Sequence, residues 1–394
     1  MQVSKEVGGS CRIPFGIRTA ILLSFFPLGI LFWVHYPVRE VIVLCVWVWA
    51  FPSQIGYLSF LLLLLAFSAA HAYFAFNLFV VLETLAIGVA FGRWVIAARE
   101  ELIWRLHRFL RTCLILSLVI AAIQAINGAP WLRAFPEMFA VGHGRGSGLR
   151  TEPSLLASPL VLYLGFALCK FARQYAKGVK QRGLFLEVIG LISATTLLTR
   201  SLTVLLVVLC FLPTFVSKLS HLVLFCIGGA ISAAAALGTR VSAAISDSET
   251  FTYFITTAFN SWRNIPDIII FLNWRDFLLP GNPAEVRDKI NLLATIWNPG
   301  FFWLDNTYST FSASASTIGL LATMAIFSLG IRLGLRRTTN AASIRVAWIM
   351  LYVADWFVLP KYEPCGWVAL GLLTAAATVP ARAAVEPLLV PTAE

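Results

Sequence analysis

Long, uninterrupted runs of apolar residues constrain this 394-residue chain more than any other feature. Hydrophobic residues make up 59% of it and charged residues only 12%, against about 45–50% and roughly 25% in soluble domains. So few charges cannot cover the surface of a soluble protein. Continuous runs such as residues 61–65, all leucine, also lack the alternation of a transmembrane β-barrel. Because lipid offers the backbone no hydrogen bonds, the sequence predicts an all-α polytopic membrane protein.

The apolar runs predict about 12 transmembrane helices, at roughly 20 residues per span. Residues 41–70 form either one kinked helix or two short ones, with a break at Pro52-Ser53-Gln54. The expected spans are residues 17–36, 41–51, 55–70, 73–97, 112–127, 154–169, 184–199, 201–216, 220–238, 311–331, 346–359 and 366–381. The chain thus divides into helices one to nine (1–238), a long loop (239–310), and helices ten to twelve with a C-terminal tail (311–394).

The distribution of basic residues favours two helices within 41–70. Both termini then lie in the cytoplasm, and 19 of the 30 Lys and Arg residues lie on that side. Six lie in short outer segments and five in the long outer loop. The positive-inside rule counts short loops, so it supports this orientation.

The net charge of +11 follows from the same cytoplasmic excess, so we expect no nucleic-acid partner. The seven cysteines include no CxxC pair and no pairing with histidine, which argues against redox or metal chemistry. We therefore expect neither a metal nor a cofactor.

The first long outer segment, 128–153, is rich in glycine and arginine. Four glycines surround His143 and Arg145, and Arg150 and Glu152 follow before Pro153-Ser154. Glycines allow backbone amides and guanidinium groups to converge on an anion, and the proline favours a helix start. The alternative is a solvated loop in which an Arg–Glu pair caps the next span.

A single arginine, Arg200, separates two apolar runs of 16 residues each (184–199 and 201–216). Spans this short place the arginine below the outer surface, in a pocket or at its mouth. An ionisable residue held there is a functional hypothesis by default. The alternative is that its side chain extends outward to the lipid headgroups.

The 72-residue loop 239–310 is too long for a simple connection, and its many aromatic residues argue against disorder. It contains Arg263, an adjacent Arg275–Asp276 pair that is also typical of an ordinary surface, and Asp305 near its end. We expect the chemistry to lie there and in 128–153.

Three acidic residues, Glu83, Glu187 and Asp355, lie within expected spans and have no basic partner on their own helices. They are either neutral or paired across helices.

The order of these segments resembles that of bacterial Wzy-type polysaccharide polymerases and their relatives, the O-antigen ligases. The residues Arg145-x-x-Gly148-x-x-x-Glu152-Pro153-Ser154 are similar to the family's R-x-x-G-x-x-x-E-P-S segment. Thr199-Arg200-Ser201 is similar to its arginine-containing turn. Arg263 and Gly281 resemble its large-loop arginine and downstream glycine motif. Asp305-Asn306 stands where the relatives carry a His-Asn or similar pair.

This resemblance implies a C-type glycosyltransferase-like fold, in which a helical bundle encloses a periplasmic cavity roofed by the long loop. The protein would lie in the bacterial inner membrane. It would transfer a glycan from undecaprenyl diphosphate to an acceptor hydroxyl on another lipid-linked repeat unit. Its partners would be the lipid-linked oligosaccharide, the bilayer, and a chain-length regulator and flippase.

The charges of the outer segments, taken together with this resemblance, suggest roles for individual residues. Arg145, Arg200, Arg263 and Arg275 would bind the diphosphate, because guanidinium groups bind phosphate oxygens through two parallel hydrogen bonds. Asp305 would be the general base, with Glu152 orienting Arg145 and Arg263 contributing to catalysis.

Two alternatives stay open. A ligase would transfer the finished glycan to another acceptor, but none of the five histidines stands at the family's histidine position just before the tenth span. Gly281-Asn282-Pro283 also lacks the family's second glycine. A lipid-linked sugar flippase or transporter would show internal repeats, and none is detectable. Convergence of Glu83, Glu187 and Asp355 at mid-membrane would favour it.

Overall fold

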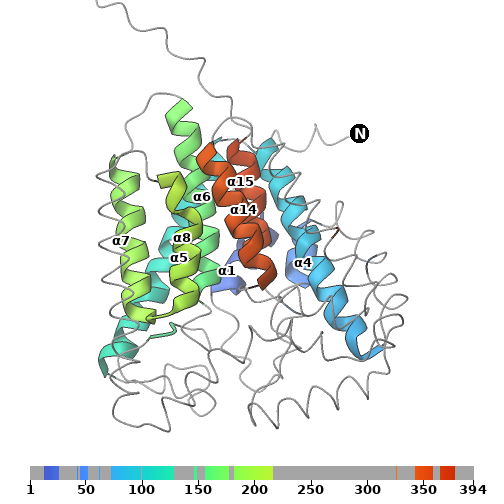
Figure 1. Cartoon of the computed structure of the whole chain (residues 1–394), viewed down its shortest axis with the longest axis horizontal. Coiled ribbons are helices and arrows are strands. Elements are labelled where there is room, and N and C mark those ends of the chain that lie inside the picture. The colour runs from blue at the N-terminus through green and yellow to red at the C-terminus, as the bar shows by residue number, and fades with distance from the viewer. Residues whose placement is uncertain are drawn as a thin grey trace, which may run out of the picture.

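The computed structural model describes residues 13–25, 42, 45–51, 62, 72–98, 100–127, 146–148, 156–176, 182–215, 325, 342–357 and 364–377. Every regular element within these ranges is a helix, and none is a strand (Figure 1). The helices are α1 (Phe15–Phe25), α4 (Ala72–Ala97), α5 (Glu100–Asn127), α6 (Ala157–Ala176), α7 (Arg182–Thr199), α8 (Leu202–Phe215), α14 (Ala342–Phe357) and α15 (Cys365–Ala377). The all-helical expectation is confirmed for this part of the chain.

Each of these helices coincides with one expected span, but α5 begins at Glu100 rather than at residue 112. Its first turns are amphipathic: Ile103, Leu106 and Leu110 are buried, whereas Arg105 and Arg108 are exposed. Because these turns carry charged residues on one face, the continuous apolar run began only at residue 112 and did not predict them. The long loop 239–310 and the spans expected at 220–238 and 311–331 lie outside the described residues, apart from position 325.

Two described helices are long and apolar enough to cross a membrane, Glu100–Ile126 and Arg182–Thr199. Two shorter segments, Ala157–Phe171 and Cys365–Ala376, are also apolar. These helices are compatible with a membrane protein.

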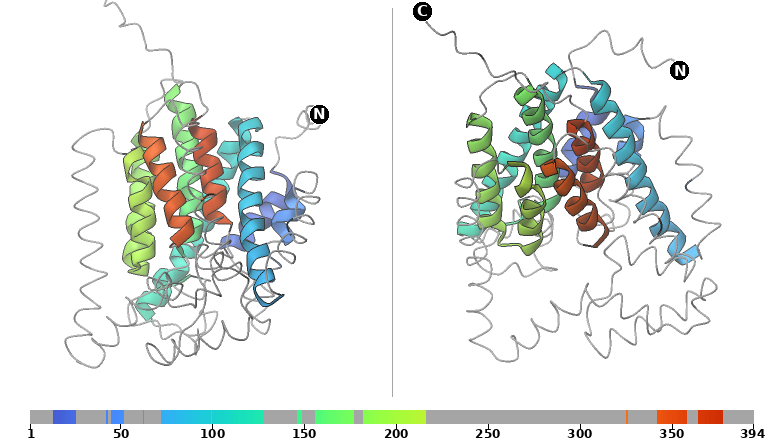
Figure 2. Two further views of the ribbon diagram at one scale, coloured as in Figure 1. Left: turned by 45° about the vertical axis from the view of Figure 1, so that its right-hand side comes forward. Right: turned by 45° about the horizontal axis from the view of Figure 1, so that its top comes forward.

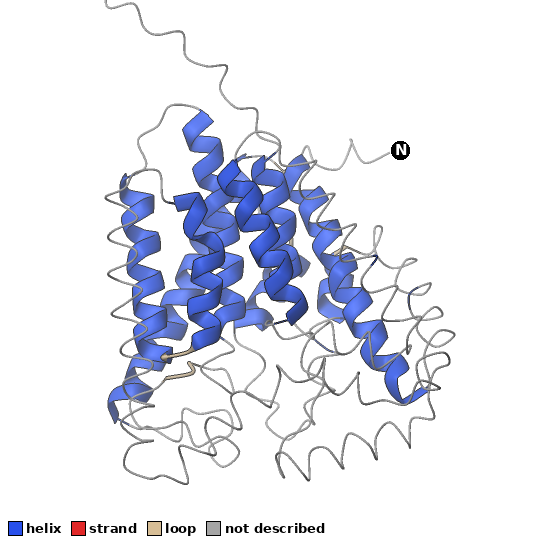
Figure 3. Cartoon of the chain, in the orientation of Figure 1, coloured by secondary structure: helices blue, strands red, loops and turns tan. Residues whose placement is uncertain are grey.

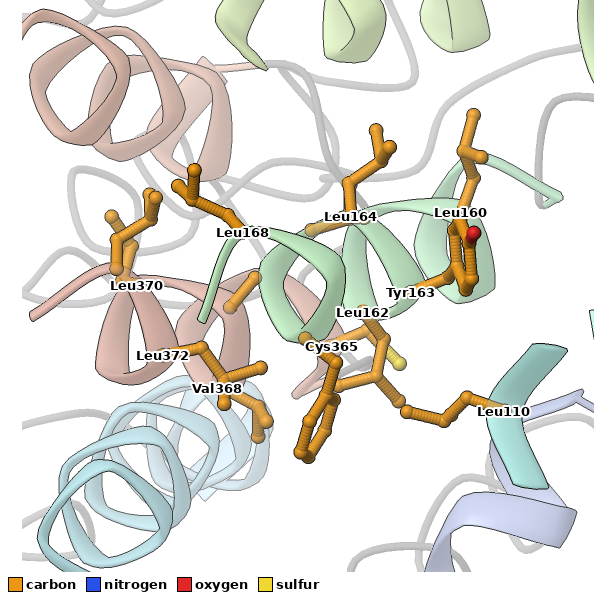
Figure 4. Packing of buried hydrophobic residues seen from close by; sticks show 14 of the residues in the cluster. Leu110, Leu160, Leu162, Tyr163, Leu164, Leu168, Cys365, Val368, Leu370 and Leu372 are labelled. Atoms are coloured by element: carbon orange, nitrogen blue, oxygen red, sulfur yellow. The ribbon is translucent and has the colours of Figure 1, made fainter. Parts of the chain in front are cut away.

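Helix α6 forms the centre of the bundle. Every residue from Leu156 to Cys169 is buried, as expected for a helix that is apolar on all sides. It packs against α15, α5, α8, α7 and α1. Its leucines point toward several neighbours in Figure 4, with Leu168 close to α15. The two further views show the same helices side by side (Figure 2).

Glycines bring α4 and α15 into backbone contact. A Cβ added to Gly92 would lie 2.8 Å from the Cα of Gly371, and one added to Gly371 would lie 2.6 Å from the Gly88 carbonyl oxygen. Gly88 and Gly92 are four residues apart and therefore share one helix face. Small residues in this arrangement are typical of helix packing in membranes, where close van der Waals contact drives association.

Candidate functional site

The glycine segment Gly146–Gly148 lies against the end of α7. The Gly146 N–H donates a hydrogen bond of 2.9 Å to the carbonyl oxygen of Leu198. Figure 3 shows two short non-helical segments, in tan, side by side at this end of the bundle. Leu198 lies two residues before Arg200, so the structure brings together two motifs that are far apart in the sequence.

Helix α5 holds the other side of this segment through Gln124. The side-chain oxygen of Gln124 accepts a hydrogen bond of 2.9 Å from the Ser147 N–H. Its side-chain nitrogen donates one of 2.6 Å to the Gly148 carbonyl oxygen. The Gln124 side chain is buried, and both ends of its amide are therefore satisfied by the segment.

The glycines allow this close approach. A Cβ added to Gly146 would overlap the Ala121 carbonyl, and one added to Gly148 would lie 2.5 Å from the Ser117 hydroxyl. Gly148 also has a φ of +63°, which favours glycine. Our expectation that backbone amides of this segment bind an anion is wrong for Gly146 and Ser147, because their N–H groups are donated to Leu198 and Gln124.

Arg200 forms the turn between α7 and α8. Its N–H donates to the Thr196 carbonyl oxygen at 2.8 Å, and its φ of 48° is left-handed. Glycine is the usual residue at such a helix end, so an arginine there costs conformational energy. The residue is half-buried, and no acidic side chain in the described ranges pairs with it.

The threonines that precede Arg200 donate their hydroxyl protons within α7. The hydroxyls of Thr195, Thr196 and Thr199 each donate to a carbonyl oxygen one turn back in α7, at 2.7 to 2.9 Å. Arg200 is therefore the charged group that α7 presents at this end.

The structure places one of the six predicted site residues, Arg200. The other five lie outside the described residues: Arg145, Glu152, Arg263, Arg275 and Asp305. The helix start expected at Glu152-Pro153-Ser154 lies outside them as well.

A separate cluster of polar side chains surrounds Glu187 on α7. The Arg111 guanidinium and the Tyr163 hydroxyl donate to its carboxylate at 3.1 and 2.8 Å, and His107 Nε2 lies 3.6 Å away. Lys170 lies 3.5 Å from the other nitrogen of His107. Glu187 is thus paired across helices, one of the two states left open by the sequence.

This group lies far from Arg200 along α7. Thirteen residues of α-helix separate Glu187 from Arg200, a rise of about 20 Å. His107 and Tyr163 were not singled out by sequence. His107 and Arg111 are four residues apart and therefore share one face of α5. This spacing was the sequence pattern that could have predicted a polar cluster there.

The other two acids of the expected spans are buried on different helices, Glu83 on α4 and Asp355 on α14. The Asp355 carboxylate lies directly against Gly366 of α15, so a side chain at Gly366 would displace it. Glu187 and Asp355 thus belong to separate contacts.

No group of three or more His, Cys, Asp or Glu residues in the described part of the chain is arranged to hold a metal ion.

No family model matches the chain, and no curated protein matches it.

Proposed function

We propose that the chain is an inner-membrane glycosyltransferase that polymerises polysaccharide repeat units carried on undecaprenyl diphosphate. The observation that carries this proposal is the hydrogen bond between Gly146 and Leu198. It joins the first segment on which the resemblance to Wzy-type polymerases depends, Arg145 to Ser154, to the residue just before the second, Thr199 to Ser201.

The charges of this end of the bundle suit a diphosphate. Gly146 follows Arg145 in the chain, and Leu198 closely precedes Arg200. Arg200 is half-buried and has no acidic partner among the described residues. Guanidinium groups bind phosphate oxygens in pairs of parallel hydrogen bonds, so arginines from two elements can bind different edges of one diphosphate.

The proposed reaction needs a base and an anion site. The base removes the proton of the acceptor hydroxyl, whose oxygen bonds to the anomeric carbon of the donor glycan. The bond from that carbon to the diphosphate oxygen breaks, and undecaprenyl diphosphate leaves with the bonding electrons. Arg145, Arg200, Arg263 and Arg275 would stabilise its charge. Asp305 would be the base, and Glu152 would orient Arg145.

The finer architecture belongs to the same proposal. We infer about 12 transmembrane helices, a C-type glycosyltransferase-like bundle, and a periplasmic roof formed by residues 239–310. A flippase would supply the lipid-linked unit and a chain-length regulator would limit the product.

The contacts of the membrane acids favour an enzyme over a transporter. Glu187 is paired with side chains of α5 and α6, whereas Asp355 lies against α15. A transporter site formed by the three acids would require them to meet near the bilayer midplane.

The decisive experiment is polymerisation by the purified full chain in proteoliposomes supplied with an undecaprenyl-diphosphate oligosaccharide. Products would be separated by size. A ladder of glycans that still carries undecaprenyl diphosphate supports a polymerase. Transfer of a single unit to a non-lipid-linked acceptor, or movement of lipid without a new glycosidic bond, would refute it.

A further inference from the structure

We propose that Arg108, Arg111 and Lys170 bind the phosphate group of an anionic phospholipid. These three residues, the cation cluster, lie at the end of the bundle opposite the Arg200 turn. Such a site requires a protein that lies in a membrane. It does not depend on the reaction proposed above, because none of the three residues belongs to the proposed active site.

The cation cluster is built from two helices that pack against each other, α5 and α6. The Lys170 ammonium of α6 lies 3.5 Å from His107 Nδ1 and 5.3 Å from the centre of the Trp104 ring, both on α5. These two residues and the two arginines recur at intervals of three and four along α5, so they share one helix face. The charges of Arg111 and Arg108 both act on Lys170 at this position.

The Glu187 carboxylate beside the cation cluster has too little charge to neutralise it. Its Oε2 atom accepts from the Arg111 guanidinium at 3.1 Å, and its Oε1 atom accepts from the Tyr163 hydroxyl at 2.8 Å. No carboxylate in the described part of the chain forms an ion pair with Lys170 or Arg108. Three cations beside one carboxylate leave an excess of positive charge.

The cation cluster is accessible to an anion and is stabilised by binding one. Arg108 is exposed, whereas Arg111 and Lys170 are half-buried. Charges interact more strongly at half-buried positions than at fully exposed ones, because less water screens them. The neighbouring cations therefore repel one another, and a bound anion offsets this repulsion.

The position of the cation cluster along the helices favours a lipid over a soluble anion. Arg111 directly precedes the apolar run that begins at residue 112, and Lys170 directly follows the run that ends at residue 169. In a membrane both cations would lie where the hydrocarbon ends and the lipid headgroups begin, a level at which tryptophans such as Trp104 are enriched. Guanidinium groups bind phosphate oxygens through parallel hydrogen bonds, and an ammonium adds a point charge.

The experiment titrates the detergent-purified full chain with phosphatidylglycerol, which is anionic, and with phosphatidylcholine, which is zwitterionic. Native mass spectrometry measures the lipid that each protein retains. The wild type should retain phosphatidylglycerol in preference to phosphatidylcholine. In Lys170→Met, which keeps an apolar side chain against Trp104 but loses the charge, affinity for phosphatidylglycerol should fall on the order of 10-fold, because a hydrogen bond to a charged group is lost.

A second variant and two controls complete the experiment. Arg108→Gln should weaken phosphatidylglycerol binding as well, and it should fold because the Arg108 side chain is exposed. Lys170→Arg keeps the positive charge and should keep most of the affinity. Arg93→Gln removes an exposed arginine of α4 outside the cation cluster and should change the affinity by less than about 2-fold.

Four results would overturn the lipid site. They are equal retention of both lipids by the wild type, wild-type affinity in both Lys170→Met and Arg108→Gln, an equal loss in Arg93→Gln, and displacement of the lipid by inorganic phosphate. The third result would indicate non-specific attraction, and the fourth would indicate a site for a soluble anion. None of them bears on the polymerisation assay, so the proposed function would stand.

Discussion

Arg200 combines a backbone conformation suited to glycine with a charge that no described acidic group neutralises. A left-handed conformation costs an L-residue roughly 1–2 kcal/mol, a cost that glycine avoids. The conformation therefore makes a functional role at this position testable.

We predict that Arg200→Gly lowers polymer formation without lowering stability. The melting temperature in detergent should stay the same or rise, since strain is relieved. Turnover should fall by roughly 30- to 1000-fold, or about 2–4 kcal/mol, because one charge-assisted contact to the leaving diphosphate is lost. Arg200→Lys should fail nearly as badly, because lysine lacks the planar fork.

The control for Arg200 is Arg105→Ala. Arg105 is exposed, pairs only with Glu101 one turn away, and should tolerate alanine. Full polymer length in Arg200→Lys, or unfolding of Arg200→Gly, would contradict the role assigned to Arg200.

We predict that Asp305→Asn lowers turnover and leaves donor affinity nearly unchanged, because a base acts in the transition state and not in binding. Glu152→Gln should weaken donor binding as well, through a less well oriented Arg145. Single-turnover kinetics with a fluorescent lipid-linked donor measure both quantities. Near-normal turnover in Asp305→Asn, with none in Glu152→Gln, would reverse the two roles.

At the scale of elements, the contact of α4 with α15 depends on glycines. Gly92 and Gly371 approach so closely that a methyl group on either meets backbone atoms. Backbone atoms cannot move aside as a flexible side chain can, so the two helices would have to separate.

We predict that Gly92→Ala destabilises the protein by about 1–3 kcal/mol, the usual range for overpacking. Gly190→Ala on α7 is the matched control, because nothing lies within 4 Å of an added Cβ there. Alanine is the better helix former by about 1 kcal/mol, so the control should be neutral or stabilising. Thermal unfolding in detergent measures both. A Gly92→Ala protein that melts at or above the wild-type temperature would contradict the packing.

At the scale of the whole molecule, Glu187 with its partners and the Arg200 turn lie at opposite ends of α7. Arg111 and Lys170 join Glu187 and His107 at one end, and Gly146 joins Leu198 at the other. The positive-inside rule predicts that the basic segments and the proposed site lie on opposite sides of a membrane, and this orientation stays a prediction.

We predict that Asp276 is periplasmic and Lys177 cytoplasmic, because basic residues of short loops stay inside. In a variant without the seven native cysteines, an impermeant thiol reagent should label Asp276→Cys in intact cells. Lys177→Cys should react only after lysis. Labelling of Lys177→Cys in intact cells would overturn the orientation.

The sequence by itself determined where most described helices lie, because sustained hydrophobicity is a local property. The ranges expected for α4, α7 and α8 differ from those observed by at most two residues. The position of Arg200 between two helices was also predictable, because it is a single charged residue between two apolar runs. The start of α5 was not, because its first turns are held by buried contacts such as those of Leu106 and Leu110.

Only the tertiary structure decided which distant residues meet. The contacts of Gly146 with Leu198, Gln124 with Gly148, and Glu187 with Arg111 each join different helices or segments. The hydrophobic pattern of the sequence predicts which residues become buried. It does not predict which hydrogen-bond partner each buried polar group has. That choice depends on how the helices pack, because most buried donors and acceptors find their partners within the same bundle.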